Sequence, residues 1–317
     1  MRWIIAMCLP ALVAAWFPDN VTSVAIRGVH GPVHMPLLGL GTWQYNDSRS
    51  EDAILAAFKL GYRHVDTASV YANAVGVGRA LKKTGVKRGE FFVTSKLAIG
   101  LNVSATVQAM YQNLKDLQLD YVDLMLIHIP PTGAQARQDQ WKALEQFAKA
   151  GKAKAIGVSH FCKRQLQDIL SIATVPVAVN QVQYHVGMGI ASDMATDYKT
   201  WVQSQGILYQ SFSPLCGPCN ATNGDQMALK TGALVTGIGK KYNKTGAQVA
   251  LKWLVQQGIP AIPKSSNPKH LSEDINIFDF KLSDDDMATL TSATVPPVGG
   301  GPSPQDSGDC GMEEVLV

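Results

Sequence analysis

The sequence carries no surplus of charge of either sign. Its 317 residues hold 28 Lys and Arg against 25 Asp and Glu, which leaves a formal net charge of +3. Proteins that bind a nucleic-acid backbone gather a clear basic excess, so we expect no nucleic-acid partner. Beyond residue 17 the chain also has no apolar run of about 18 residues or more, which excludes a protein built from several membrane-spanning helices.

Cysteine is scarce, and no metal-binding pattern is present. Five cysteines in a chain of this length exclude a small disulfide scaffold. Cys216 and Cys219 have the spacing of a redox dithiol, but they precede a Gly- and Asn-rich segment. We interpret them as a loop that can close a disulfide, with redox catalysis as the alternative. A metal-dependent barrel hydrolase would need a His-x-His pair on its first strand, and none of the seven histidines forms one, so we expect no metal.

The N-terminus has the pattern of a secretory signal peptide. A short basic start precedes an almost unbroken apolar run from Trp3 to a small-residue cleavage site at Ala15. We expect residues 1–15 to be the signal and residues 16–317 to be one domain, with no membrane span once the signal is removed. An uncleaved anchor and an N-terminal core helix are the alternatives, and without a signal the protein would be cytoplasmic.

Sites for N-linked glycosylation point to the same route. The chain has eleven asparagines, and five of them stand in the N-x-S/T pattern, more than chance alone would give. The five are Asn20, Asn46, Asn102, Asn220 and Asn243. We expect a glycoprotein of the secretory pathway, in the endoplasmic reticulum lumen or secreted, and coincidental occurrence of the pattern is the alternative.

Strand-like and helix-like segments alternate along the chain. The expected strands are 36–40, 63–66, 91–94, 122–127, 153–158, 178–181, 207–211 and 259–262. Helical periods lie between them, for example at 50–60, 105–117, 138–150, 163–172, 191–205 and 245–257. Eight alternations predict an α/β fold, a (β/α)8 TIM barrel whose active site lies at the C-terminal ends of the strands. We also expect a hairpin at 23–35 below the barrel and an outer helix at 282–291, which gives a core of about 23–292.

Four ionisable side chains lie at or just beyond expected strand ends. Asp66, Lys96 and His128 each end a strand, and Tyr71 follows Asp66 by five residues. Taken singly they have plainer interpretations, such as a buried ion pair or a core histidine. In a barrel these strand ends meet at one rim, so we expect the four to share a catalytic site.

These residue types suit the reduction of a carbonyl group. An ammonium beside a phenol lowers the phenol's pKa, which makes Tyr71 a proton donor. The Asp66 carboxylate keeps Lys96 charged, and a neutral His128 can orient a carbonyl oxygen. Since no side chain supplies a hydride, we expect a nicotinamide cofactor.

The sequence resembles the aldo-keto reductases in six separated segments, from about residue 33 to about residue 292. The segments are 61–73, 123–130, 151–161, 179–185, 211–215 and 262–267. The resemblance implies a monomeric oxidoreductase of the NADP-dependent alcohol dehydrogenase type, with NADPH as cofactor, a small carbonyl compound as substrate and Tyr71 as proton donor. It also implies that Asp66 and Lys96 lower the pKa of Tyr71. The alternatives are NADH as cofactor and a non-catalytic cofactor-binding barrel that serves as a sensor or partner subunit.

The resemblance also implies the contacts of cofactor and substrate. The cofactor contacts are Gly41, Thr42, Asp66, Ser159, His160, Gln181, Phe212, Ser213, Leu215, Lys264, Ser265, Ser266, His270, Glu273 and Asp274. The substrate contacts are Trp43, Tyr71, His128 and Ile129. Within the first set, Ser159, His160 and Gln181 would bind the nicotinamide amide, and Lys264, Ser265 and Ser266 the adenosine 2′-phosphate.

Several positions depart from the family pattern, and three of them bear most directly on the site. His160 stands where asparagine is usual, and Ile129 stands where an aromatic residue is common, which suggests a wider substrate pocket. His270 replaces an arginine that grips the 2′-phosphate, and no other side chain matches the planar guanidinium for that task. Because Lys264 remains, we still expect NADPH to be preferred.

Overall fold

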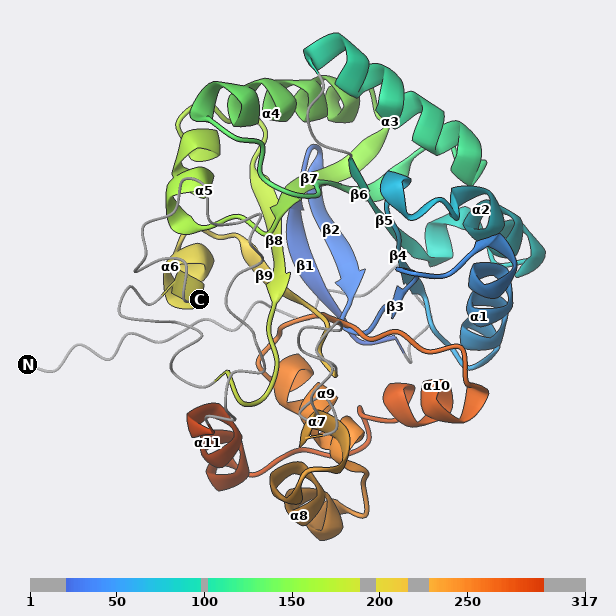
Figure 1. Ribbon diagram of the computed structural model, residues 1–317, viewed down its shortest axis with the longest axis vertical. Helices are drawn as coiled ribbons and strands as arrows, with labels where there is room; N and C mark the ends of the chain where they lie inside the picture. Colours follow the sequence, from blue (N-terminus) through green and yellow to red (C-terminus); the bar gives the residue numbers. More distant parts are fainter. Residues whose placement is uncertain (1–20, 98–101, 189–197, 216–227, 294–317) are drawn as a thin grey trace, which may run out of the picture.

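Eight parallel strands form a barrel in the computed structural model, which describes residues 21–97, 102–188, 198–215 and 228–293 (Figure 1). The strand order is β10-β9-β8-β7-β6-β5-β4-β3. The strands are β3 (Leu40–Gly41), β4 (His64–Asp66), β5 (Phe92–Leu97), β6 (Val122–Ile127), β7 (Ala153–Ser159), β8 (Val177–Gln183), β9 (Leu208–Phe212) and β10 (Ala261–Ile262). The expected TIM barrel is confirmed.

The two edges of the sheet meet along a short seam between the segment of β3 and that of β10. Leu38 bridges Ala261, and the amide of Gly39 donates to the carbonyl oxygen of Ala261 at 2.9 Å. In return the amide of Ala261 donates to Leu37, and the amide of Gly41 donates to Pro263, both at 2.9 Å. These few bonds bring the first and last strands together.

Helices surround the barrel (Figure 1). They are α1 (Asp47–Lys59), α2 (Ala74–Lys83), α3 (Val103–Leu117), α4 (Ala134–Lys149), α5 (Lys163–Leu170), α6 (Tyr198–Ser204), α7 (Ala228–Thr231), α8 (Ala233–Tyr242), α9 (Gly246–Gln256), α10 (Pro268–Ile275) and α11 (Asp284–Ser292). Two 3-10 turns, η1 (Ser69–Tyr71) and η2 (Arg88–Glu90), complete the set. None of the helices in the described part of the chain has the length and apolarity needed to cross a membrane.

Polar caps decide where several helices begin. The side chain of Asn46 accepts from the amide of Arg49 at the start of α1, and that of Asn102 accepts from Ala105 at the start of α3. Thr245 forms a capping box at α9. Each cap satisfies an amide that would otherwise have no partner in the first helical turn.

The N-terminal hairpin closes the barrel floor. Its strands β1 (Ser23–Gly28) and β2 (Gly31–Pro36) pair antiparallel. Ile26 and Met35 are buried against Phe92, Leu124 and other side chains of the barrel interior. The expected hairpin is therefore confirmed, and α11 confirms the outer helix.

The first expected strand is only partly right. Residues 36–40 divide between two pairings, because Pro36 still pairs with Ser23 in the hairpin whereas β3 begins at Leu40. The expected helix at 191–205 is seen as α6, and residues 191–197 lie outside the described part of the chain. The proposed signal at 1–15 also lies outside it.

One cysteine of the described residues is oxidised. Cys162, the residue before α5, is disulfide-bonded. The other four cysteines, Cys8, Cys216, Cys219 and Cys310, lie outside the described residues, as does the loop expected around 216–219.

Candidate active site

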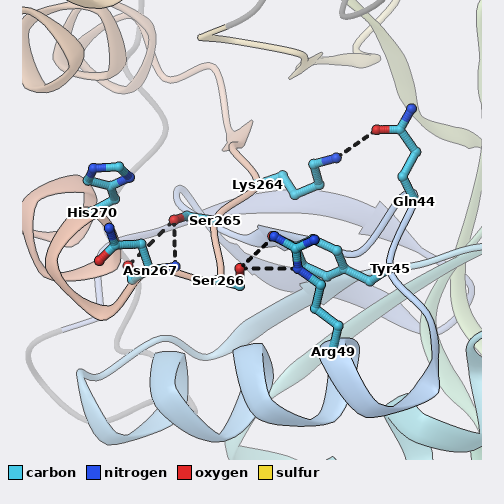
Figure 2. Close-up of a pocket in the computed structure, with 8 residues that line it drawn as sticks. All are labelled: Gln44, Tyr45, Arg49, Lys264, Ser265, Ser266, Asn267 and His270. Carbon is cyan, nitrogen blue, oxygen red and sulfur yellow. Dashed lines mark hydrogen bonds between the residues drawn. The ribbon is translucent and has the colours of Figure 1, made fainter.

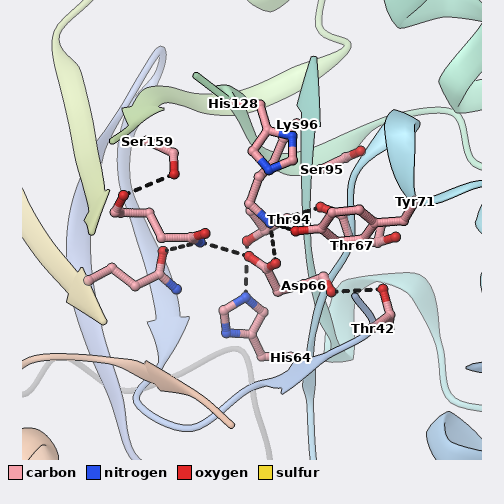
Figure 3. Close-up of polar contacts among 12 residues, drawn as sticks. Thr42, His64, Asp66, Thr67, Tyr71, Thr94, Ser95, Lys96, His128 and Ser159 are labelled. Atoms are coloured by element: carbon pink, nitrogen blue, oxygen red, sulfur yellow. Dashed lines mark hydrogen bonds and ion pairs between the residues drawn. The ribbon is translucent and has the colours of Figure 1, made fainter. Parts of the chain in front are cut away.

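The four residues expected to share a site come together at the C-terminal rim of the barrel (Figure 3). Asp66 is the last residue of β4, Lys96 lies near the end of β5, and His128 directly follows β6. Tyr71 ends the 3-10 turn η1, which the chain forms just after β4. Parallel strands that end at one rim explain how residues up to 62 positions apart in sequence come into contact.

A buried ion pair forms the base of this site. Lys96 and Asp66 are 1% and 2% exposed, and the Lys96 ammonium donates to an Asp66 carboxylate oxygen. The same ammonium donates to the carbonyl oxygen of Thr67 at 3.1 Å and to the hydroxyl of Tyr71 at 3.4 Å. Burial works against the charge, but Asp66 and Tyr71 together outweigh it and raise the pKa of Lys96. Lys96 therefore stays an ammonium at neutral pH.

The pKa of Tyr71 is higher than the sequence analysis expected. Burial raises the pKa of this phenol, the Lys96 charge lowers it, and the Asp66 carboxylate raises it again, with a net increase. The predicted effect of Lys96 is right in direction, but the expected net decrease is wrong, and so is the direction predicted for Asp66. Desolvation disfavours a phenolate more than one ammonium favours it. Tyr71 is thus held in its protonated form.

His128 lies next to Tyr71 and is neutral. Their ring centroids are 5.6 Å apart at an interplanar angle of 72°. Burial, the charge of Lys96 and the neighbouring His160 lower the pKa of His128 to about 2. A neutral imidazole has one N–H donor and one acceptor nitrogen, and it does not compete with Lys96 for the Asp66 carboxylate as a charged ring would.

An amide chain that the sequence analysis did not identify extends the ion pair. The side-chain amide of Gln181 donates to the second carboxylate oxygen of Asp66 at 2.8 Å and to Gln210 at 3.0 Å. Both glutamines are buried. The family resemblance implied that Gln181 binds the nicotinamide, whereas its side-chain amide is engaged here by Asp66 and Gln210.

The expected nicotinamide contacts lie side by side at the ends of β7 and β9. Ser159 donates its hydroxyl to the carbonyl oxygen of Gln181 at 2.9 Å. The Nδ1 atom of His160 lies 3.1 Å from the carbonyl oxygen of His128, and its ring centroid lies 4.7 Å from that of Phe212. Burial lowers the pKa of His160 to about 4. His160 is therefore a neutral ring that links the two sides of the site.

The remaining expected contacts lie around the same rim. Thr42 is buried and donates its hydroxyl to the carbonyl oxygen of Asp66 at 3.1 Å, so it supports the end of β4. Trp43 is 38% exposed in the following loop, and Ile129 is half-buried beside His128. Ser213 and Leu215 are half-buried just after β9.

A second set of expected residues lines a cavity of about 350 Å³, which we call the cationic cavity (Figure 2). Its lining residues are Gln44, Tyr45, Arg49, Lys264, Ser265, Ser266, Asn267 and His270. Lys264, Ser265, Ser266 and His270 were expected from the sequence, and the other four were not. Glu273 and Asp274 do not line this cavity. Within the described ranges, no three His, Cys, Asp or Glu side chains gather to hold a metal ion.

The sequence and the fold both match known proteins. Residues 37–294 match the aldo/keto reductase family. Glyoxal reductase of Bacillus subtilis is 39% identical over 261 residues, which cover 82% of this chain and 89% of that protein. Aldo-keto reductase family 1 member A1 of Xenopus tropicalis is 36% identical over 295 residues, 85% of this chain and 88% of that protein.

A solved structure supports the same assignment. The crystal structure of an aldo/keto reductase from Brucella melitensis has a TM-score of 0.75 and 32% identity, and the match covers 85% of this chain and 99% of that one. The family match over residues 37–294 includes all eight barrel strands and the four clustered residues. The chain therefore belongs to the aldo/keto reductase family.

Proposed function

We propose that this protein reduces a small aldehyde or ketone to an alcohol, with NADPH as cofactor and Tyr71 as general acid. The observation that carries the proposal is the buried Lys96–Asp66 pair with its ammonium 3.4 Å from the phenolic oxygen of Tyr71. Family membership supports carbonyl reduction, and one relative is named for its action on glyoxal.

Each side chain has a distinct task in the proposed reaction. A carbonyl oxygen held between the Tyr71 hydroxyl and the His128 ring accepts the phenolic proton and becomes a hydroxyl. Lys96 then stabilises the phenolate left on Tyr71, and Asp66 keeps Lys96 charged and oriented. When bound, the reduced nicotinamide supplies the hydride that no side chain can provide.

The donor set of the cationic cavity fits the phosphate of such a cofactor. Its lining offers the Arg49 and Lys264 charges and the hydroxyls of Ser265 and Ser266, and it contains no carboxylate. Charge-assisted hydrogen bonds of this kind are the stronger ones, and a phosphate has only acceptor oxygens to satisfy. Lys264, Ser265 and Ser266 would hold the adenosine 2′-phosphate, with the nicotinamide near Ser159, His160 and Phe212.

The substitution Tyr71→Phe tests the proposed acid. Loss of the only proton donor should lower turnover of an aldehyde by roughly 10²–10⁴-fold, whereas NADPH should still bind, as measured by quenching of protein fluorescence. Turnover within threefold of the parent would refute the role of Tyr71. An inactive parent that binds NADPH would favour a non-catalytic barrel instead.

We also propose that the chain enters the secretory pathway, with residues 1–15 as signal and 16–317 as one domain. The disulfide at Cys162 supports this, since disulfides persist in oxidising compartments. Three of the glycosylation sites lie in the described residues, at Asn46, Asn102 and Asn243, and all three are exposed. The endoplasmic reticulum lumen would reconcile a signal with a nicotinamide cofactor.

A further inference from the structure

We propose that Arg49, in the first turn of α1, is a specificity-determining residue that binds the 2′-phosphate of NADPH. It would supply from α1 the guanidinium that His270 does not supply from α10. This inference rests on the cofactor proposed above, and it concerns a residue outside every segment that carried the family resemblance.

The side chain of Arg49 is directed at the hydroxyl of Ser266 (Figure 2). Its Nη2 and Nε atoms lie 3.1 and 3.3 Å from the Oγ atom of Ser266. A guanidinium has five N–H donors in a planar fork, so donors remain for a phosphate placed beside Ser266. Arg49 and Ser266 are 217 positions apart, and they meet because α1 and α10 follow the two strands of the seam.

The backbone and a neighbouring ring hold Arg49 in this position. The amide of Arg49 donates to the cap residue Asn46 at 2.8 Å, which sets the first turn of α1. The guanidinium lies over the buried ring of Tyr45, 4.9 Å from its centroid. The carbonyl oxygen of Tyr45 in turn accepts from the side-chain amide of Asn73 at 3.0 Å. Such preorganisation lowers the entropy that a flexible side chain would lose on binding.

The charge balance of the cavity calls for an anion. Lys264 donates to the neutral Gln44 at 2.9 Å and lies over the same Tyr45 ring, at 5.4 Å. Among the described residues no carboxylate lies within ion-pair distance of Arg49 or Lys264. Burial and the nearby Arg49 charge both lower the pKa of Lys264. A phosphate dianion would neutralise two cations that otherwise repel each other.

His270 cannot fill this role in the same way. It lines the same cavity from α10 and is exposed. An imidazole offers at most one donor at each of two nitrogens, in a geometry that does not match two phosphate oxygens at once. Arg49 provides the forked donor, and it reaches the same cavity from the opposite end of the sequence.

Calorimetric titration with two adenosine nucleotides tests the role of Arg49. The probes are adenosine 2′,5′-bisphosphate and adenosine 5′-monophosphate, which differ only in the 2′-phosphate. We define the discrimination as the ratio of their dissociation constants in one protein. The variants are Arg49→Met and Arg49→Lys, and Lys59→Met is the matched control because it removes one exposed cation from the far end of the same helix.

We expect Arg49→Met to reduce the discrimination by about tenfold or more, as for a lost hydrogen bond to a charged group. Arg49→Lys should fall between parent and Met, since it keeps the charge and loses the fork, and Lys59→Met should match the parent. If Arg49→Met discriminates as well as Lys59→Met, or weakens both nucleotides equally, the inference is overturned and the NADPH proposal stands. If the parent does not discriminate, the NADPH proposal itself fails.

Discussion

Among single residues, Lys264 supplies the charge on which the proposed preference for NADPH mainly depends. Ser265 and Ser266 donate hydrogen bonds without charge, so Lys264→Met should raise the Michaelis constant for NADPH far more than that for NADH. In the same assays His270→Arg should tighten NADPH binding, by about 1.5–3 kcal/mol, the range for hydrogen bonds to charged groups. Steady-state rates give the Michaelis constants, and fluorescence titration of both variants gives the cofactor affinities.

The effects of substitutions at positions 49 and 270 on NADPH binding should depend on each other. If Arg49 already contacts the phosphate, the gain from His270→Arg should be larger in an Arg49→Met background than in the parent, because a second fork then replaces a missing one. Equal gains in both backgrounds would mean that the two positions contact different groups.

For the Lys264→Met prediction, equal weakening of NADPH and NADH binding would move the cofactor assignment to NADH.

For single residues, the sequence predicted which side chains lie at the barrel rim, but it did not predict how deeply they are buried or which distant residues they contact. Asp66, Lys96 and His128 were found because strand ends converge in a barrel. The sign of the Tyr71 shift depends on burial, which no local pattern reveals, and burial outweighs Lys96. Arg49 was missed for a related reason. Its contact with Ser266 spans 217 positions, and its only local signal is a place three residues after a capping asparagine.

Helix α10 contains a carboxylic acid that folding makes harder to ionise. Asp274 is 4% exposed; burial raises its pKa from 3.8 to about 7, Glu273 adds to this, and Lys230 opposes it. Because the folded pKa lies above the unfolded one, the stabilising contribution is complete below about pH 4 and is lost as pH rises through about 7.

The substitution Asp274→Asn should therefore stabilise the protein more at pH 8 than at pH 5. Between pH 5 and pH 8 the gain should grow by at most about 3 kcal/mol, since roughly two pH units separate pH 5 from the folded pKa of about 7 and each is worth about 1.4 kcal/mol. Urea unfolding of parent and variant at both values measures it in protein without nucleotide. The control is Asp285→Asn on α11, which makes the same chemical change at an exposed position. A stability difference that does not change with pH would contradict the prediction.

Helices and strands were predicted well where they are long enough for the hydrophobic pattern to repeat. Central strands such as β6 are apolar runs, interrupted in β6 only by Asp123, and α4 and α9 show a full helical period. The segment 36–40 was misassigned because an apolar run does not reveal that the hairpin and the barrel share it.

At the scale of the whole molecule, the proposed secretory route predicts a processed and modified chain. Expressed in a secretory host, the protein should begin near Trp16 and carry glycan at Asn102 and Asn243. Both side chains are exposed. Asn102 caps α3 through its Oδ1 atom and Asn243 ends α8 through its backbone N–H, so neither contact uses the side-chain nitrogen that would carry a glycan. Intact mass spectrometry before and after glycosidase treatment measures both. An intact Met1 with both asparagines unmodified would place the protein in the cytosol.

The seam has a consequence for when the barrel becomes complete. Its two sides are separated by more than 200 residues, so a ribosome must make nearly the whole barrel before Gly39 can pair with Ala261. Contacts so distant in sequence form late in folding, and we expect the few hydrogen bonds of the seam to open readily and their amides to exchange. The cationic cavity draws Arg49 from one side of this joint and Lys264 from the other. A nucleotide bound there, as proposed above, would hold the two sides of the seam together. Adenosine 2′,5′-bisphosphate should therefore slow hydrogen exchange at Gly39, Gly41 and Ala261 more than it slows exchange in β6.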